Sequence, residues 1–201
     1  MSAAAIFDTT LALKRRIEAG LAPGETVYVG QPVRAELGES SVALFLFSAE
    51  PNRDLRNTVR TALPTGLGPQ TAPLGEERAI PLDLRYLVAA FRKTGAAPGA
   101  DPEELLRLGE VIQALENDPM LTEAEAAGQL VRITLEPAPI DELNRIWAVF
   151  PEESYQTSLV YLASPVWVSA GLPTVGPPVL SREQRTGLSA EPPRVFADAA
   201  S

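Results

Sequence analysis

The sequence predicts an α+β domain in residues 1–170, with a single mixed or antiparallel β-sheet flanked by helices, and an extended C-terminal arm in residues 171–201. Residues 80–91 (IPLDLRYLVAAF) alternate at strand spacing between an apolar face and a face that carries charge. Residues 3–20 and 101–117 instead repeat apolar side chains every three to four positions, as amphipathic helices do. Residues 171–201 contain five prolines and three glycines, a composition that does not favour a packed core.

The composition narrows the classes of protein to which the chain can belong. A length of 201 residues and an apolar content of 45% suit one globular domain with an arm. The net charge of −9 argues against a nucleic-acid-binding protein, which needs an excess of Lys and Arg for phosphate contacts. The chain has no Cys and no His, which removes thiol catalysis, the Ser-His-Asp triad and the metal sites that these residues build.

The first predicted helix, residues 3–20, has an apolar stripe that includes Leu13 and Ile17, and Gly20 marks its end. We expect this stripe to pack in the core, although a helix that faces a partner would show the same spacing. No signal peptide is expected, because the basic residues 14–16 follow the apolar run instead of preceding it. Since no segment approaches the ~18 apolar residues of a membrane helix, we expect a soluble protein without membrane insertion, made in the cytoplasm.

Two strands are predicted before the first long loop. Residues 26–30 (TVYVG) are β-branched and aromatic, and Pro32 limits this strand to an edge of the sheet or ends it. Residues 41–50 (SVALFLFSAE) are apolar on both faces, so we expect a central strand that is covered on both sides.

Residues 51–64 form the one basic island of an acidic chain. Arg53, Arg56 and Arg60 would share one face if this segment were helical. Two interpretations stay open: a solvated face, or a contact with an acidic neighbour such as another copy of the chain, for which the forked guanidinium is well suited. The three arginines and Asn57 are therefore candidate interface residues.

The strand that follows is predicted to anchor the domain. Its apolar face places Leu82, Leu84 and Tyr86 in the core. Its other face carries Asp83 and Arg85, which we interpret either as an internal ion pair, the interpretation we favour, or as part of a contact between subunits.

The second long helix begins at Asp101, a good N-cap, with two glutamates in its first turn. Its predicted core stripe consists of Leu105, Leu108, Ile112 and Leu115. The acidic residues at its start are explained by the helix dipole and do not require a catalytic role.

Three shorter elements are predicted next. Residues 122–125 (TEAE) have the form of a capping box and predict a short helix. Residues 131–136 alternate as a half-exposed strand. Asp141 is predicted to cap a helix in which Trp147 packs in the core, although an exposed Trp at this spacing would instead anchor an interface.

The last strand is predicted over residues 156–170, with Leu159, Tyr161, Pro165 and Trp167 on one face. Leu159 and Tyr161 are predicted core residues. Because Pro165 cannot donate a hydrogen bond to a neighbouring strand, it marks an edge position or a bulge. An apolar edge strand is a place where another chain can add a strand.

The C-terminal arm carries scattered apolar residues, among them Val179 and Leu180, which we expect to dock onto a neighbouring subunit. No phosphate-binding loop, calcium loop or nucleophile elbow occurs in the chain, so we predict no catalytic, cofactor-binding or metal-binding residues. The carboxylates of Asp83 and Asp141 are explained as an ion-pair partner and a helix cap. The residues alone therefore indicate an interaction protein and not an enzyme.

The order of the motifs adds a resemblance. The segments LDLRYLV, LGEVIQALENDPML, ELNRIWAVF and SLVYLASPVWV follow one another as in the tail-terminator, or cap, domain of contractile injection systems, phage-tail-like particles in which a sheath surrounds a tube. The similarity spans about residues 3–170. Tyr155, Ser158 and Tyr161 match the family's last-strand pattern, whereas Arg85 stands where many relatives carry a histidine.

This resemblance implies a ring, typically a hexamer, that seats on the sheath and the inner tube, ends their polymerisation and holds the last sheath layer. The implied partners are other copies of the chain and the sheath and tube proteins, with no cofactor. After assembly in the cytoplasm, the protein would become part of the injection particle. The alternative is an assembly adaptor or chaperone that binds a tail or sheath partner through its edge strand and C-terminal arm.

Overall fold

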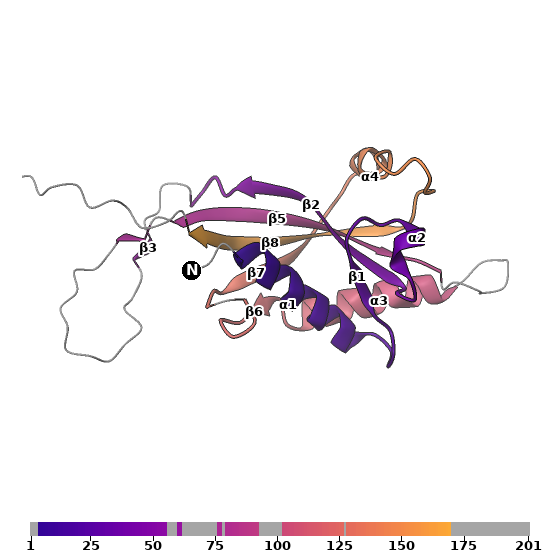
Figure 1. The fold of residues 1–201 in the computed structure, drawn as a ribbon, viewed down its shortest axis with the longest axis horizontal. Coiled ribbons are helices and arrows are strands. Elements are labelled where there is room, and N and C mark those ends of the chain that lie inside the picture. The colour runs from indigo at the N-terminus through magenta and orange to yellow at the C-terminus, as the bar shows by residue number, and fades with distance from the viewer. Residues whose placement is uncertain are drawn as a thin grey trace, which may run out of the picture.

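The computed structural model describes residues 4–55, 60–61, 76–77, 79–92, 102–126 and 128–169 (Figure 1). The strands of the main sheet are β1 (Val27–Val29), β2 (Val42–Pro51), β5 (Ala79–Ala90), β6 (Met120–Leu121), β7 (Val131–Glu136) and β8 (Ser158–Ser169). The helices are α1 (Ala5–Gly20), α2 (Arg34–Leu37), α3 (Pro102–Asn117) and α4 (Ile140–Trp147). A separate pair of short strands consists of β3 (Arg60–Thr61) and β4 (Glu76–Glu77).

The main sheet has six strands in the order β1-β2-β5-β8-β7-β6. β1 runs parallel to β2, and the other neighbouring strands run antiparallel. The prediction of an α+β fold built on one mixed sheet is therefore confirmed, and so is the edge position of the 26–30 strand. The predicted arm, residues 171–201, lies outside the described residues.

β5 lies in the middle of the sheet, and both of its faces are covered. It pairs along its length with β2 on one side and β8 on the other. Leu84 and Tyr86 are fully buried in a core that includes residues of α1 and α3, and Leu82 is partly buried against it. Leu87 and Ala89 belong to a second core that includes residues of α4. The same strand therefore joins two hydrophobic layers, one on each side of the sheet.

α1 and α3 lie side by side on one face of the sheet, and α4 lies over part of the other face (Figure 1). α1 approaches α3 closely at Gly20, where any Cβ atom would clash with the Cβ of Ala114. α1 is also joined to β5 by a buried hydrogen bond of 2.8 Å between the hydroxyls of Thr10 and Tyr86. Burial raises the pKa of Tyr86 to about 12, so this hydroxyl stays protonated.

α4 packs through Trp147, which is 4% exposed and lies in the core of its layer. The Trp147 ring meets those of Phe91 and Phe150 at centroid distances of 6.2 and 6.1 Å. The helix begins at Ile140, with Pro139 in the N-cap position. Asp141 lies inside the first turn, where its charge favours the helix dipole, so the prediction that it caps the helix is wrong.

β8 contains a bulge that changes its predicted pattern. Leu82 and Leu84 of β5 pair with Val166 and Ala163, so Ser164 and Pro165 together lie opposite one residue of β5. The bulge was one of the two interpretations of Pro165, and the other, an edge strand, is wrong because β8 lies between β5 and β7.

The bulge also reverses the alternation of side chains along β8. Tyr161 and Ala163 share the α1–α3 core with Val166, not with Pro165 and Trp167 as strict alternation predicts. Tyr161 is fully buried there, and Leu159 is partly buried against this core. One inserted residue in a strand of period two is sufficient to exchange its faces.

The buried face of α3 is rotated from the predicted one. Leu108, Val111 and Leu115 are buried and Ile112 is partly buried, but Leu105 is 66% exposed. At 3.6 residues per turn, Leu105 points about 80° away from Leu115 around the helix axis. The helix instead buries Arg107, whose guanidinium forms ion pairs with Glu103 at 2.9 Å and with Glu25 at 3.7 Å.

The short helix predicted at residues 122–125 is absent, since residues 123–126 form a turn. Residues 53–55 also form a turn, and Arg60 lies in the strand β3. Within the residues that the structure describes, no helix is both long enough and apolar enough to cross a membrane.

Candidate assembly interface

The turn after β2 is held in place by Asn52, a residue that the sequence did not single out. Its side-chain amide donates to the Asp83 carboxylate at 2.8 Å and to the Ser164 hydroxyl at 3.2 Å. Its side-chain oxygen accepts the backbone N–H groups of Asp54 and Leu55 at 3.1 and 2.9 Å. The amide thus ties the turn to the β8 bulge.

Two candidate interface residues of the basic island, Arg53 and Arg60, do not lie in a helix. Arg53 is exposed in the turn that Asn52 holds, and Arg60 lies in β3. Arg56 and Asn57 lie outside the described residues, as do Val179 and Leu180 of the arm. The structure therefore presents Arg53 at the surface and leaves the rest of this predicted interface a hypothesis.

Arg85 forms an internal ion pair, but not with Asp83. Its guanidinium contacts Glu136, at the end of β7, at 2.9 Å and Glu142, in α4, at 3.5 Å. Asp83 is instead an acceptor for Asn52 and Ser164. Arg85 thus links three elements on the α4 side of the sheet, and the predicted Asp83–Arg85 pairing is wrong because the β8 bulge brings Ser164 to Asp83.

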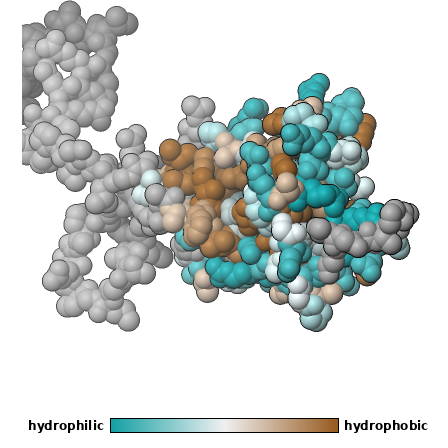
Figure 2. Space-filling view, turned by 45° about the vertical axis from the view of Figure 1, so that its right-hand side comes forward, coloured by the Kyte–Doolittle hydropathy of each residue, from teal (hydrophilic) through white to brown (hydrophobic). Residues whose placement is uncertain are grey.

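Apolar side chains are exposed where the sheet extends beyond α1. Ile80 is 47% exposed and Phe7 is 62% exposed. Leu46, Leu82 and Val168 are only partly buried. Figure 2 shows hydrophobic side chains gathered toward the end of the sheet at which β5 begins and β8 ends. An exposed apolar area of this kind is typical of a protein that assembles with others.

The opposite face of the sheet carries an apolar groove between β2 and α4. It encloses about 350 Å³, and its apolar walls are Phe45, Phe47, Ile146, Val149 and Phe150. Glu142 and Arg145 complete the lining. A second hollow of about 200 Å³ shares Val149 and Phe150 and is bordered by Glu152 and Glu153. The two hollows adjoin at Val149 and Phe150, just after the C-terminal end of α4.

Aromatic rings in edge-to-face contact form and support the walls of this groove. Phe45 and Phe150 meet edge to face at 5.5 Å, and Trp147 contacts Tyr155 at 6.3 Å. The Trp147 indole N–H donates to the Ser158 hydroxyl at 3.1 Å, which fixes the ring. These contacts hold Phe45 and Phe150, two of the groove walls, against the aromatic core of the α4 layer.

The groove was not predicted from the sequence. Its signal was the apolar character of both faces of residues 41–50, which we took to mean a covered strand. The structure leaves Phe45 and Phe47 only partly buried. α4 has eight residues and is too short to cover the whole length of β2.

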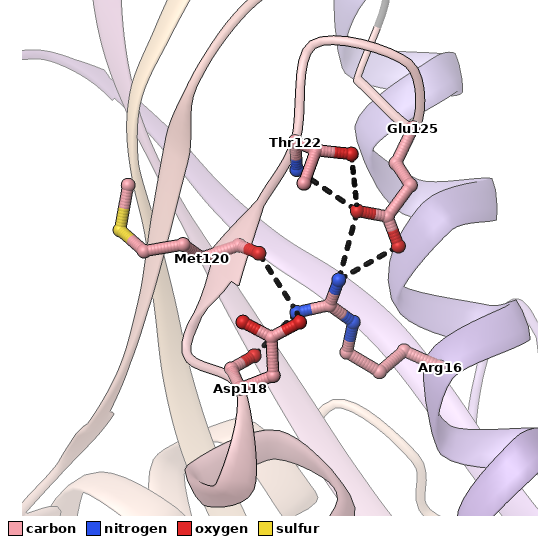
Figure 3. A network of polar contacts seen from close by, with 5 residues as sticks. All are labelled: Arg16, Asp118, Met120, Thr122 and Glu125. Atoms are coloured by element: carbon pink, nitrogen blue, oxygen red, sulfur yellow. Dashed lines mark hydrogen bonds and ion pairs between the residues drawn. The ribbon is translucent and has the colours of Figure 1, made fainter.

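On the α1 side, a polar cluster holds residues 118–125 against α1 (Figure 3). The Arg16 guanidinium donates to the Met120 carbonyl at 2.9 Å and to both oxygens of the Glu125 carboxylate at 2.7 and 2.8 Å. It also reaches the Asp118 carbonyl and pairs with the Asp118 carboxylate at 3.3 Å. Arg16 therefore satisfies backbone carbonyls and carboxylates of residues 118–125 and holds this segment against α1.

Glu125 and Thr122 make one of the two contacts of the predicted capping box, from the Thr122 N–H to the Glu125 carboxylate, although residues 123–126 form a turn and not a helix. The Thr122 backbone N–H and hydroxyl donate to the Glu125 carboxylate at 2.9 and 2.7 Å. The backbone hydrogen bond from Thr122, with smaller contributions from its hydroxyl and from Arg16, lowers the pKa of Glu125 to about 2, against the opposing effect of partial burial.

No group of three or more acidic side chains that could hold a metal ion occurs in the part of the chain that the structure describes. The features that remain are surfaces: an exposed arginine turn, an apolar sheet end and an aromatic groove. They suit contacts with other proteins.

Two solved structures have a similar fold. The sheath/tube terminator of an extracellular contractile injection system (PVC), in its extended state, matches with a TM-score of 0.60 and 17% identity over 92% of this chain and 65% of that chain. The tube terminating cap of the anti-feeding prophage matches with a TM-score of 0.60 and 17% identity over 90% of this chain and 61% of that chain. The chain spans less than two thirds of the length of either structure.

No curated protein matches the sequence. The family model described as the Pvc16 N-terminal domain matches residues 8–182. This match spans most of the chain, including every strand of the main sheet and all four helices except the first residues of α1. The chain therefore belongs to the Pvc16 N-terminal domain family.

Proposed function

We propose that this chain is the cap of a contractile injection system: it forms a ring, expected to be a hexamer, that ends the polymerisation of sheath and tube and holds the distal sheath layer. The observation that carries this proposal is the family match over residues 8–182, together with a fold similar to those of two proteins described as a sheath/tube terminator and a tube terminating cap.

The surfaces of the chain support a ring. A ring requires heterologous contacts, in which one patch of each copy binds a different patch of the next. The Arg53 turn lies near the end of the sheet where β5 begins, and the aromatic groove lies beside α4. Two unlike surfaces on one chain are what a heterologous contact needs. We propose that the basic island, Arg53, Arg56 and Arg60 with Asn57, contributes to one side of it.

The proposed role requires no catalysis and no cofactor. The chain lacks both His and Cys, and its net charge of −9 disfavours nucleic acid as a partner. We propose that the protein works as a structural component of the particle, in contact with sheath and tube proteins, after assembly in the cytoplasm. An adaptor that leaves before maturation has no specific observation in its favour.

Co-expression with the tube and sheath proteins of the same particle tests the proposal. With the wild-type chain, we expect sheath–tube structures of uniform length that carry the chain at one end in electron micrographs. Without it, their lengths should be irregular. Structures of uniform length in its absence would overturn the proposed function, and its absence from purified particles would favour the adaptor.

Native mass spectrometry of the purified chain tests the ring contact. The double substitution R53E/R56E should reduce the ring population severalfold, because charge reversal replaces attraction by repulsion at each contact. R15E is the matched control, since Arg15 is exposed on α1 and away from the basic island. An unchanged ring in R53E/R56E would remove the basic island from the interface.

A further inference from the structure

The groove between β2 and α4 is open to a partner. Among the residues that the structure describes, Val149 at its rim is 71% exposed, and Ile140 at the start of α4 is 57% exposed. Its volume of about 350 Å³ has room for two or three side chains of Val or Leu size. Its walls are mostly apolar, so a matching ligand needs apolar side chains and few unpaired polar groups.

The aromatic walls favour one class of ligand. Phe45 and Phe150 meet edge to face, and Phe47 extends the same surface along β2. Grooves lined by aromatic rings bind proline-rich segments, because an extended proline-rich chain has little conformational entropy to lose and packs its rings flat against the aromatic side chains.

The chain itself contains such a segment. Residues 173–182 read PTVGPPVLSR, with three prolines and the apolar residues Val175, Val179 and Leu180. Its only charged residue is Arg182.

One acidic side chain beside the groove is placed to meet the charge of the segment. Glu142 already pairs with Arg85 at 3.5 Å, and Glu153 accepts the backbone N–H of Arg34 at 2.7 Å. Glu152, in the adjoining hollow, is exposed, and a basic residue at the end of an apolar ligand can meet its carboxylate, which sets the direction of binding.

The distance along the sheet favours a groove on another copy. Phe45 pairs with Leu87, which pairs with Val160, and β8 ends at Ser169. At ~3.3 Å per residue, the stretch of β8 between Val160 and Ser169 spans about 30 Å. For Val179 to reach the groove of its own chain, about nine residues after Ser169 must run back fully extended along the sheet. Binding to the groove of a neighbouring copy does not require this extended conformation.

We propose that this groove binds the proline-rich segment 173–182 of a second copy of the chain. Val179 and Leu180 fill its apolar floor, and Arg182 lies beside Glu152 in the adjoining hollow. The contact is heterologous, since the segment begins at one end of the sheet and the groove lies on the α4 face. It extends the proposed ring by naming one of its contacts, and its test is separate from that of the cap function.

A labelled peptide measures the contact directly. A fluorescein-labelled peptide of residues 171–183 is titrated with the full-length variant V179D/L180D, whose own segment cannot compete for the groove. We expect saturable binding by fluorescence anisotropy. V149D in the same background should weaken binding at least about tenfold, because it places a charge at the apolar rim that the ligand must cover. L105D is the matched control, since Leu105 is equally exposed on the opposite side of the sheet.

A charge exchange tests the direction of binding. The peptide with R182E should bind more weakly to the V179D/L180D chain, and E152R in that chain should restore its binding. Equal binding of the peptide to the parent variant and to V149D would overturn the proposal. Thermal unfolding by circular dichroism checks that each variant is folded.

Mixing distinguishes a second copy from the same copy. Full-length V149D retains the segment, and full-length V179D/L180D retains the groove, so an equimolar mixture should form 1:1 heterodimers that neither variant forms alone. A mixture that stays monomeric would overturn binding between copies.

If the wild-type chain caps tubes but the peptide does not bind, this proposal fails alone. If the peptide binds but tube length is not controlled, the cap function fails alone.

Discussion

Among single residues, Arg16 joins several segments of the α1 side through polar contacts. Its side chain is 11% exposed, and it joins the end of α3, the strand β6 and the 123–126 turn to α1. The partner carboxylate, Glu125, is 35% exposed. Its stabilising effect comes mainly from hydrogen bonds to the ionised form, because solvent weakens the ion pair itself.

Glu125 makes stability depend on pH in a defined direction. Its pKa in the folded chain is about 2, below its ordinary value of 4.5, so the unfolded chain takes up the proton first as the pH falls. The stabilisation of the folded chain by the ionised Glu125 carboxylate is complete above about pH 4.5 and is lost as the pH falls toward about 2. E125Q should therefore lower stability by about 1 kcal/mol at neutral pH, the usual effect of losing a capping carboxylate.

Thermal melts between pH 7 and pH 2.5, followed by circular dichroism, measure this effect. The difference in Tm between wild type and E125Q should shrink as the pH falls below about 4.5. E123Q is the control, because Glu123 is exposed in the same turn and should change the Tm little at any pH. A difference that stays constant with pH would rule out the ionised carboxylate as its cause.

Among the elements, α3 shows how a helix selects its buried face. Its apolar residues cover more than half of its circumference, so the apolar pattern alone allows several rotations about the helix axis. The ion pairs of Arg107 with Glu103 and Glu25 are consistent with the observed rotation. Leu105 consequently faces outward although its spacing matches the core stripe.

A pair of substitutions on α3 tests this rotation. L115A should destabilise the protein by about 2 to 5 kcal/mol, because Leu115 is 1% exposed and its removal leaves a cavity. L105A should change stability by less than about 0.5 kcal/mol. Urea unfolding followed by circular dichroism measures both, and a large loss in L105A would mean that this face of α3 is covered in solution.

At the scale of the whole molecule, two hydrophobic layers share one sheet. β5 alternates its side chains between them, with Tyr86 in the α1–α3 layer and Leu87 in the α4 layer. A loss of packing in one layer therefore weakens the strand that supports the other. We expect the described domain to unfold in a single cooperative transition.

Tryptophan fluorescence tests this cooperativity. In a W167F background, Trp147 is the only tryptophan and reports on the α4 layer. L115A, in the other layer, should shift the Trp147 unfolding midpoint in urea by the same amount as the midpoint from far-ultraviolet circular dichroism. L143A, beside Trp147, is the matched control for the reporter layer. Midpoints that separate in L115A would show two independent layers.

The sequence by itself determined the elements with a clear period: β5, β7, α1 and the central part of α3. Alternation and helical spacing depend on neighbours in the chain, so they can be read locally. The prediction of a mixed sheet and the resemblance to a cap domain depend on the order of these elements, and both agree with the family match.

Only the tertiary structure decided which strands lie inside the sheet and where alternation breaks. β8 lies between β5 and β7, and Pro165 lies in its bulge, where the ladder is interrupted and a backbone N–H is not needed for pairing. Arg85 pairs with Glu136 and Glu142, far away in the sequence, and not with Asp83 on its own strand. The groove between Phe45 and Val149 exists only because α4 ends before it covers β2. These features arise from contacts between distant segments, which no local period encodes.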